Sequence, residues 1–238
     1  MTPQAAYDEL IKQTKEITLL GSCASVLGWD ERTYMPRQGA QFRADQLGLV
    51  AGMCHERFTT PKIGDLLSAA ESDGLSKDPT SDTAVNLREI RHQYNRATKL
   101  PKDLFEELTK TTSLAQGEWA EARKKSNFKQ FQPRLEQVLN LTRQVADAYG
   151  WKGEPYNALL DGYEPGATVD EITAVFEPLR VDLVELLAKI KNAPKKPDVS
   201  IVEREYNIEL QRVFGEMVAA AIGFDFGAGR LDITTHPF

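Results

Sequence analysis

Apolar side chains recur every three to four residues along almost all of this 238-residue chain, which is the period of an α-helix and not of a strand. The clearest case is the stretch from 168 to 190. Its apolar stripe consists of Ile172, Val175, Phe176, Leu179, Leu183, Leu186, Leu187 and Ile190. Thr168 and Glu171 precede that stripe with the spacing of a capping box, which satisfies the first backbone amides of a helix. The sequence therefore predicts an all-α protein with roughly eight helices.

Residues that begin helices divide the rest of the chain into segments. The predicted starts lie at Thr2, near Gln41, at Thr60, Ser81 and Pro101, at Asn127 or near Pro133, and at Thr168 and Ser200. The start at Ser200 rests on a second capping box with Glu203. Residues 21–25 have small side chains, so we expect a second helix to approach the first one closely there.

One segment departs from the helical period. Residues 230–234 ("RLDIT") follow a helix ended by glycines and alternate between polar and apolar side chains, which predicts one short β-strand. The most irregular stretch inside the chain is the connector around residues 150–166. We therefore expect a single helical domain over residues 1–238, with a softer division into 1–150 and 151–238.

The charge balance and the apolar runs exclude several classes of protein. The chain carries 29 Lys and Arg against 35 Asp and Glu, a formal net charge of −6, which disfavours a nucleic-acid partner. No apolar run approaches the ~20 residues of a membrane span, and the first residues do not resemble a signal peptide. Only two cysteines are present, so we expect a protein of the reducing cytoplasm.

A complete active site is not evident from spacing. "HERFT", which starts at His55, begins like the zinc motif H-E-x-x-H, but Thr59 occupies the position of the second histidine. The sequence thus predicts no catalytic and no metal-binding residue, and we read His55 and Glu56 as hydrogen-bonding side chains at a helix end. His236 precedes a proline and could project from an extended backbone toward a cleft, although a simple chain terminus is the plainer interpretation.

Three stretches together resemble the carboxypeptidase Taq family of zinc metallocarboxypeptidases. The first is "LGWDERTYMP" at residues 27–36, followed by Gly39, Ala40, Arg43, Gln46 and "HER" at 55–57. The second and third are "YNALLDGYEPGATVDEI" and the terminal "GFDFGAGRLDITTHPF". These stretches occur in the same order as in the family, so the resemblance covers essentially the whole chain.

The resemblance implies the amino-terminal half of a two-lobed, mostly helical enzyme that removes single residues from peptide carboxyl termini. It marks His236, Pro237 and Phe238 as candidate residues of the substrate groove. It also implies a structural signature made of Trp29, Asp30, Thr33, Met35, Pro36 and Arg43. The family's zinc motif and third ligand are missing here, so the resemblance implies no cofactor in this chain and no activity by this half alone. We expect Trp29 to be buried in the turn between the first two helices.

Two histories remain open at this point. The chain is either the first half of a zinc carboxypeptidase or a naturally short, non-catalytic paralogue that acts as a helical binding or assembly module. The family commonly forms homodimers, and we expect one here that buries the terminal strand and the helix at 201–222. The expected contact residues are Tyr206, Phe214, Leu231, Ile233 and Phe238. The alternative is a monomer whose terminal segment folds back over its own helices. A peptide substrate is expected only where the second half is present.

Overall fold

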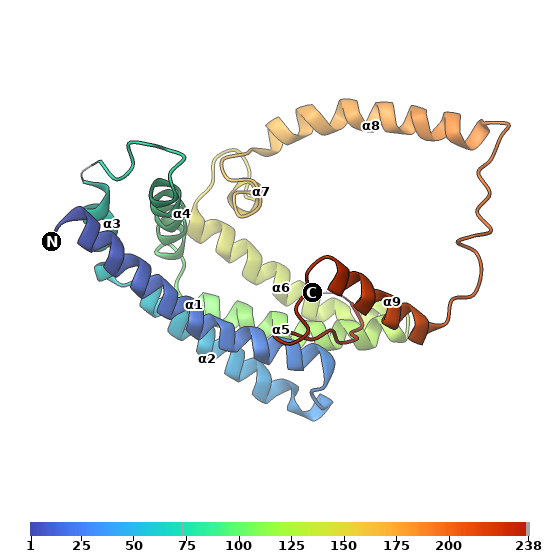
Figure 1. The fold of residues 1–238 in the computed structure, drawn as a ribbon, viewed down its shortest axis with the longest axis horizontal. Helices are drawn as coiled ribbons and strands as arrows, with labels where there is room; N and C mark the ends of the chain where they lie inside the picture. The colour runs from blue at the N-terminus through green and yellow to red at the C-terminus, as the bar shows by residue number, and fades with distance from the viewer. Residues whose placement is uncertain (73, 237–238) are drawn as a thin grey trace. The chain divides into compact units, whose positions relative to one another are not determined.

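The computed structural model describes residues 1–72 and 74–236. These residues form nine α-helices and one 3-10 helix, and no strand occurs among them, which confirms the predicted all-α class (Figure 1). In chain order the helices are α1 (Pro3–Thr33), the 3-10 helix η1 (Arg37–Gly39), α2 (Ala40–Phe58), α3 (Pro61–Glu71), α4 (Asp82–Ala97), α5 (Lys102–Lys124), α6 (Phe128–Tyr149), α7 (Tyr156–Leu160), α8 (Val169–Asn192) and α9 (Ile208–Ala221).

Side-chain caps explain where several of these helices begin. The Thr2 hydroxyl accepts a hydrogen bond from the Ala5 amide at 3.2 Å, ahead of a proline in the first turn of α1. The Asn127 side chain caps α6, so this residue, and not Pro133, marks the start of that helix. Thr168 and Glu171 form the complete capping box that the sequence predicted for α8. Each cap satisfies an amide that the helix itself leaves without a partner.

Two predictions in the last forty residues were wrong. Residues 230–234 do not form a strand, because a strand needs a neighbour for its backbone groups and no described segment pairs with them. The second capping box is also absent. Helix α9 begins at Ile208, where the Asn207 side chain accepts a hydrogen bond from the Leu210 amide at 3.1 Å, so the expected helix over 201–222 is shorter than predicted.

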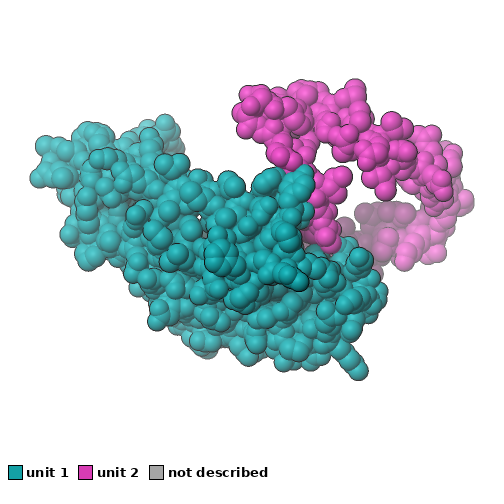
Figure 2. All heavy atoms as spheres, turned by 90° about the horizontal axis from the view of Figure 1, so that it is seen from below, with its two compact units in different colours: residues 1–167 teal, residues 168–238 magenta. Residues whose placement is uncertain are grey.

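The chain divides into two compact units, residues 1–167 and residues 168–238, which Figure 2 colours separately. The boundary lies after Ala167 and not after residue 150, because the connector that contains α7 is bonded to α4. Arg96 of α4 donates a hydrogen bond to Asp161, and it also donates to the carbonyl of Ala158 within α7. Whether the two units act as one domain stays a prediction.

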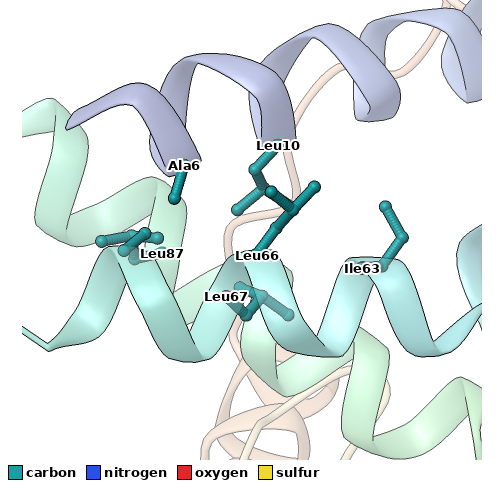
Figure 3. Packing of buried hydrophobic residues seen from close by; sticks show 7 residues of the cluster. Ala6, Leu10, Ile63, Leu66, Leu67 and Leu87 are labelled. Carbon is teal, nitrogen blue, oxygen red and sulfur yellow. The ribbon is translucent and has the colours of Figure 1, made fainter. Parts of the chain in front are cut away.

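The core of unit 1 lies where α1, α3 and α4 meet. Ala6 and Leu10 of α1 point toward α3 and α4, as Figure 3 shows. The other members of the cluster are Ile63, Leu66, Leu67 and Ala70 of α3 and Leu87 of α4. Every one of these side chains is at least 94% removed from solvent. This apolar cluster fixes the amino-terminal part of α1 against its neighbours.

Small residues allow α2 to pack closely against α1 on one side and against α5 on the other. A Cβ atom at Gly21 of α1 would lie 4.0 Å from the Cys54 sulfur, in agreement with the predicted small-sided contact. On the other side of α2, a Cβ at Gly52 would lie 2.9 Å from the Cγ of Glu106 in α5 and still closer to its carboxylate. Gly48 faces the Lys110 side chain in the same way. The α2–α5 contact therefore depends on glycine.

Unit 2 contains α8 and α9, and neither helix has a buried residue. The apolar stripe that predicted α8 is present but exposed: Leu179, Leu183 and Ile190 retain 46%, 53% and 55% of their accessible surface. The described helices include none that is both long enough and apolar enough to cross a membrane.

Candidate functional site

The signature around Arg43 joins the end of α1 to the start of α2. The Arg43 guanidinium donates to the Asp30 carboxylate and to the Leu27 carbonyl, each at 2.6 Å, and to the Gln46 side chain at 3.1 Å. The Asp30 carboxylate thus accepts a charge-assisted hydrogen bond from Arg43. One side chain of α2 thus bonds two residues of α1 and fixes the angle between these helices.

The other signature residues lie at the carboxyl end of α1 and in the turn that follows. The Thr33 hydroxyl donates to the Trp29 carbonyl at 2.7 Å, and the Met35 amide donates to the Asp30 carbonyl at 2.9 Å. Pro36 directly precedes η1. The placement of Trp29 in the turn was wrong, because α1 continues to Thr33 and includes it. These contacts terminate one helix and start the next.

Trp29 is half-buried, and its ring lies 5.6 Å from that of Tyr34. We expect Trp29→Ala to lower the free energy of unfolding by about 2 kcal/mol, less than the ~3–5 kcal/mol of a fully buried aromatic side chain. Chemical denaturation measures this change. Trp151→Ala is the matched control, because Trp151 is 45% exposed. If the two variants lose the same free energy of unfolding, the partial burial of Trp29 does not stabilise the fold as we expect.

The "HERFT" segment lies at the carboxyl end of α2 and is held there by hydrogen bonds. This agrees with the sequence-based interpretation of His55 and Glu56 as hydrogen-bonding side chains at a helix end. His55 is buried, and its ring lies 5.2 Å from that of Phe105. Burial lowers the pKa of His55, although a hydrogen bond from the imidazole to the Leu100 carbonyl partly opposes that change. Glu56 pairs with Lys102 at 2.8 Å, and the Thr59 hydroxyl donates to the His55 carbonyl at 2.8 Å.

A charged cluster that the sequence analysis missed lies between α4 and the connector. Asp161 accepts hydrogen bonds from Arg96 at 2.5 Å and from the Gly166 amide at 3.0 Å, and His92 lies 3.3 Å away. The Arg96 guanidinium also lies 4.0 Å from the centre of the Tyr149 ring. The sequence offered one signal for this cluster, which is Asp161 inside "YNALLDGYEPG". No spacing rule connects Asp161 to Arg96, which lies 65 positions earlier in the chain.

Burial alone would raise the pKa of Asp161, but the Gly166 amide and the Arg96 and His92 charges together lower it below its ordinary value. A carboxyl group with a lowered folded-state pKa contributes stability above its unfolded-state pKa of about 3.9, and that contribution is lost as the pH falls through the folded-state value. We therefore expect Asp161→Asn to lower the free energy of unfolding at pH 7 by about 1–2 kcal/mol.

The deficit of Asp161→Asn should shrink as the pH falls below about 4, because the unfolded chain then binds a proton at Asp161 that the folded carboxylate binds only at lower pH. Thermal unfolding between pH 3 and pH 7 measures this dependence. Asp182→Asn is the control, because Asp182 is exposed on α8. A deficit that stays constant across this pH range would show that the charge of Asp161 is not responsible.

A cleft of about 670 Å³ opens beside His55, and we call it the His55 cleft. Side chains of α1, α2 and α4 line it, together with Leu100, Phe105 of α5 and Tyr149 of α6. All of these residues belong to unit 1. Its exposed surface is mainly apolar, although seven of its sixteen lining residues carry polar or charged side chains. A cleft of this size can hold a small organic molecule.

Within residues 1–72 and 74–236, no three His, Cys, Asp or Glu side chains lie close enough together to hold a metal ion. The described side chains thus do not fit a zinc ion. Of the three candidate groove residues, His236 is exposed in a bend, whereas Pro237 and Phe238 lie outside the described residues. Their role in a substrate groove stays a prediction.

The helical architecture is shared with carboxypeptidases of known structure. The structure described as BsuCP superposes with a TM-score of 0.89 at 28% identity, over 98% of this chain and 47% of that one. The M32 carboxypeptidase of Deinococcus radiodurans R1 superposes with a TM-score of 0.76 at 32% identity, over 98% and 46% of the two chains. The fold is that of one half of a helical metallocarboxypeptidase.

Sequence comparison identifies the family. Residues 9–238 match the family described as carboxypeptidase Taq (M32) metallopeptidase, and the chain belongs to this family. Thermostable carboxypeptidase 1 of Thermus thermophilus is 42% identical over 100% of this chain and 48% of its own length. Carboxypeptidase 1 of Bacillus subtilis is 30% identical over 97% and 46%. The chain thus spans about half the length of the curated relatives it matches, and it aligns with their amino-terminal half.

Proposed function

We propose that this chain contributes the amino-terminal half of a zinc carboxypeptidase that removes single residues from the carboxyl ends of peptides. The observation that carries the proposal is the 42% identity to thermostable carboxypeptidase 1, which extends over the whole of this chain and 48% of the relative. The M32 family consists of zinc enzymes. The other half of such a protein would supply the metal ligands and the catalytic base, because the described residues offer no metal-binding cluster.

In this proposal, unit 1 forms a rigid wall beside the peptide and does not take part in bond cleavage. The packed core of α1, α3 and α4 supports such a role, and so does the bonding of α1 to α2 through Arg43. A wall that keeps its shape lowers the entropy lost when a peptide binds.

The test compares two proteins that differ only in length. Sequencing the gene past the codon for Phe238 gives the longer chain, which is produced alongside residues 1–238. Both are incubated with zinc and assayed for release of the last residue from an amino-blocked dipeptide. We expect turnover by the longer chain only. Turnover by residues 1–238, or a longer chain that is inactive with zinc bound, would overturn the proposal. A stop codon directly after Phe238 would instead favour the short, non-catalytic paralogue.

We also propose that the chain forms a homodimer through unit 2. Exposed apolar side chains support this, because monomeric proteins rarely expose many of them together. Phe214 retains 66% of its accessible surface and Ile233 retains 70%, and Tyr206 and Leu231 are about half exposed. Phe238, the fifth expected contact, lies outside the described residues.

Light scattering at micromolar concentration, with and without residues 230–238, tests the dimer. We expect twice the monomer mass for the intact chain and a larger monomer fraction after the deletion. A strictly monomeric intact chain would refute the proposal and favour the alternative, in which the terminal segment folds back over its own helices.

We further propose a cytoplasmic location, which the two unpaired cysteines Cys23 and Cys54 support.

A further inference from the structure

We propose that the His55 cleft binds a small carboxylic acid with an apolar body, of which a medium-chain fatty acid is the simplest example. This proposal goes beyond peptide cleavage, because the cleft lies wholly within unit 1 and the described residues there offer no metal-binding cluster. It rests on the apolar walls of the cleft, on the bonding of its polar side chains and on the charges that line it.

The walls of the cleft suit an apolar body. Ile11 and Ile17 contribute from α1, Phe58 from α2 and Ile90 from α4, and the buried Leu100 also lines the cleft. The volume of about 670 Å³ falls within the range of small-molecule sites, which is roughly 300–1,000 Å³. Burying an alkyl chain here would remove its methylene groups from water, a favourable transfer for each of them.

Most of the polar side chains that line the cleft already bond to the protein. The hydroxyls of Thr14 and Thr18 donate to carbonyls of α1, at 3.0 Å and 2.9 Å. The Asn86 amide donates to a tyrosine hydroxyl at 2.9 Å, and Arg96 is bound to Asp161 at 2.5 Å. These groups have satisfied their main hydrogen bonds and do not need a ligand.

Lys15 and Gln93 are different. Both line the cleft, from α1 and α4, and neither makes a hydrogen bond or ion pair with another residue of the described chain. Both residues are exposed, so a carboxylate bound beside them could remain partly hydrated. The Lys15 ammonium provides three donors and a positive charge, and the Gln93 amide provides two further donors. This combination favours a carboxylate over a neutral or cationic head group.

The charge of the lining points the same way. Among the described residues that line the cleft are one lysine and one arginine but no aspartate or glutamate, although the whole chain has a formal net charge of −6. Burial lowers the pKa of His55, so its imidazole is uncharged at neutral pH and adds only an aromatic surface. The Arg96 charge is compensated by Asp161, so Lys15 supplies the uncompensated positive charge. Such a lining attracts anions and repels cations.

The test is isothermal titration of the 238-residue chain with three probes that share one alkyl length: sodium octanoate, 1-octanol and octylammonium chloride. We expect octanoate to bind with a one-to-one stoichiometry and at least about tenfold more tightly than octylammonium, because the head-group charge is reversed beside Lys15. Lys15→Gln should weaken octanoate binding by about two- to fivefold, the range expected for an exposed charge pair, and should leave octanol binding unchanged.

Lys12→Gln is the matched control, since Lys12 is exposed on α1 but does not line the cleft. It should change octanoate binding by less than about twofold. Ala97→Phe fills the cleft from α4 and should weaken octanoate and octanol alike, by about tenfold or more. Equal affinity for octanoate and octylammonium, equal effects of the two lysine variants, or no saturable octanoate binding would each overturn the proposal. The lysine pair remains decisive if Ala97→Phe fails to fold.

Discussion

Leu67→Ala should lower the free energy of unfolding by about 3–5 kcal/mol, the largest effect that we expect from any single truncation in unit 1. Leu67 is fully buried in the cluster that joins α1, α3 and α4. Its removal takes apolar surface out of the core and leaves a cavity that helices on three sides cannot fill without moving. Urea denaturation followed by circular dichroism measures the loss.

The control is Leu49→Ala on α2, because Leu49 is 62% exposed. It should change the free energy of unfolding by less than about 0.5 kcal/mol. If both leucine variants lose the same stability, the cluster around Leu67 is not the core of unit 1. A loss that appears only as a changed slope against urea would instead indicate a change in the unfolded state.

Gly52→Leu should be the second most damaging change, with a loss of about 1–3 kcal/mol or more from overpacking. A Cβ at this position would lie 2.9 Å from the Glu106 Cγ and 2.6 Å from its carboxylate carbon, and the larger side chain extends further toward α5. Either Glu106 or the whole of α5 has to move. Thermal unfolding monitored by circular dichroism measures the loss.

Two further variants isolate the cause of this loss. Adding Glu106→Ala to Gly52→Leu should restore part of the stability, because it removes the side chain that the leucine meets. Gly117→Ala in α5 should instead raise the stability by up to about 1 kcal/mol, since a Cβ there meets nothing within 4 Å and alanine favours a helix. If Glu106→Ala does not rescue Gly52→Leu, crowding between α2 and α5 is not the cause of the loss.

The sequence was most informative where a structure depends on neighbouring residues. Thr2, Asn127 and Thr168 each begin a helix because a side-chain oxygen reaches an amide three residues later, and a residue pattern reveals such a contact. The period of the apolar side chains predicted the all-α class because that period also depends only on residues three to four positions apart. Arg43, which donates a hydrogen bond to Asp30, could also be singled out beforehand, because both residues belong to one recognisable signature.

Features that depend on distant residues could not be predicted. The alternation at 230–234 is compatible with a strand, but a strand exists only when another segment supplies its hydrogen bonds. Arg96 and Asp161 meet because the connector lies against α4, and nothing local to either residue indicates this. The His55 cleft has the same origin, since its walls come from helices that are far apart in the sequence.

Helix α8 has a consequence for how an assembly would form. Its capping box and the pairs Glu177–Arg180 and Glu185–Lys189 act within the helix itself, and none of them requires a partner. Isolated helices are marginal in water, and each such contact shifts the balance toward the ordered form. A surface that docks on α8 would therefore meet an apolar stripe whose side chains already lie on one face of a formed helix. Much of the conformational entropy of the α8 backbone would be lost before the encounter and not during it. Association would then be faster and less dependent on folding during binding.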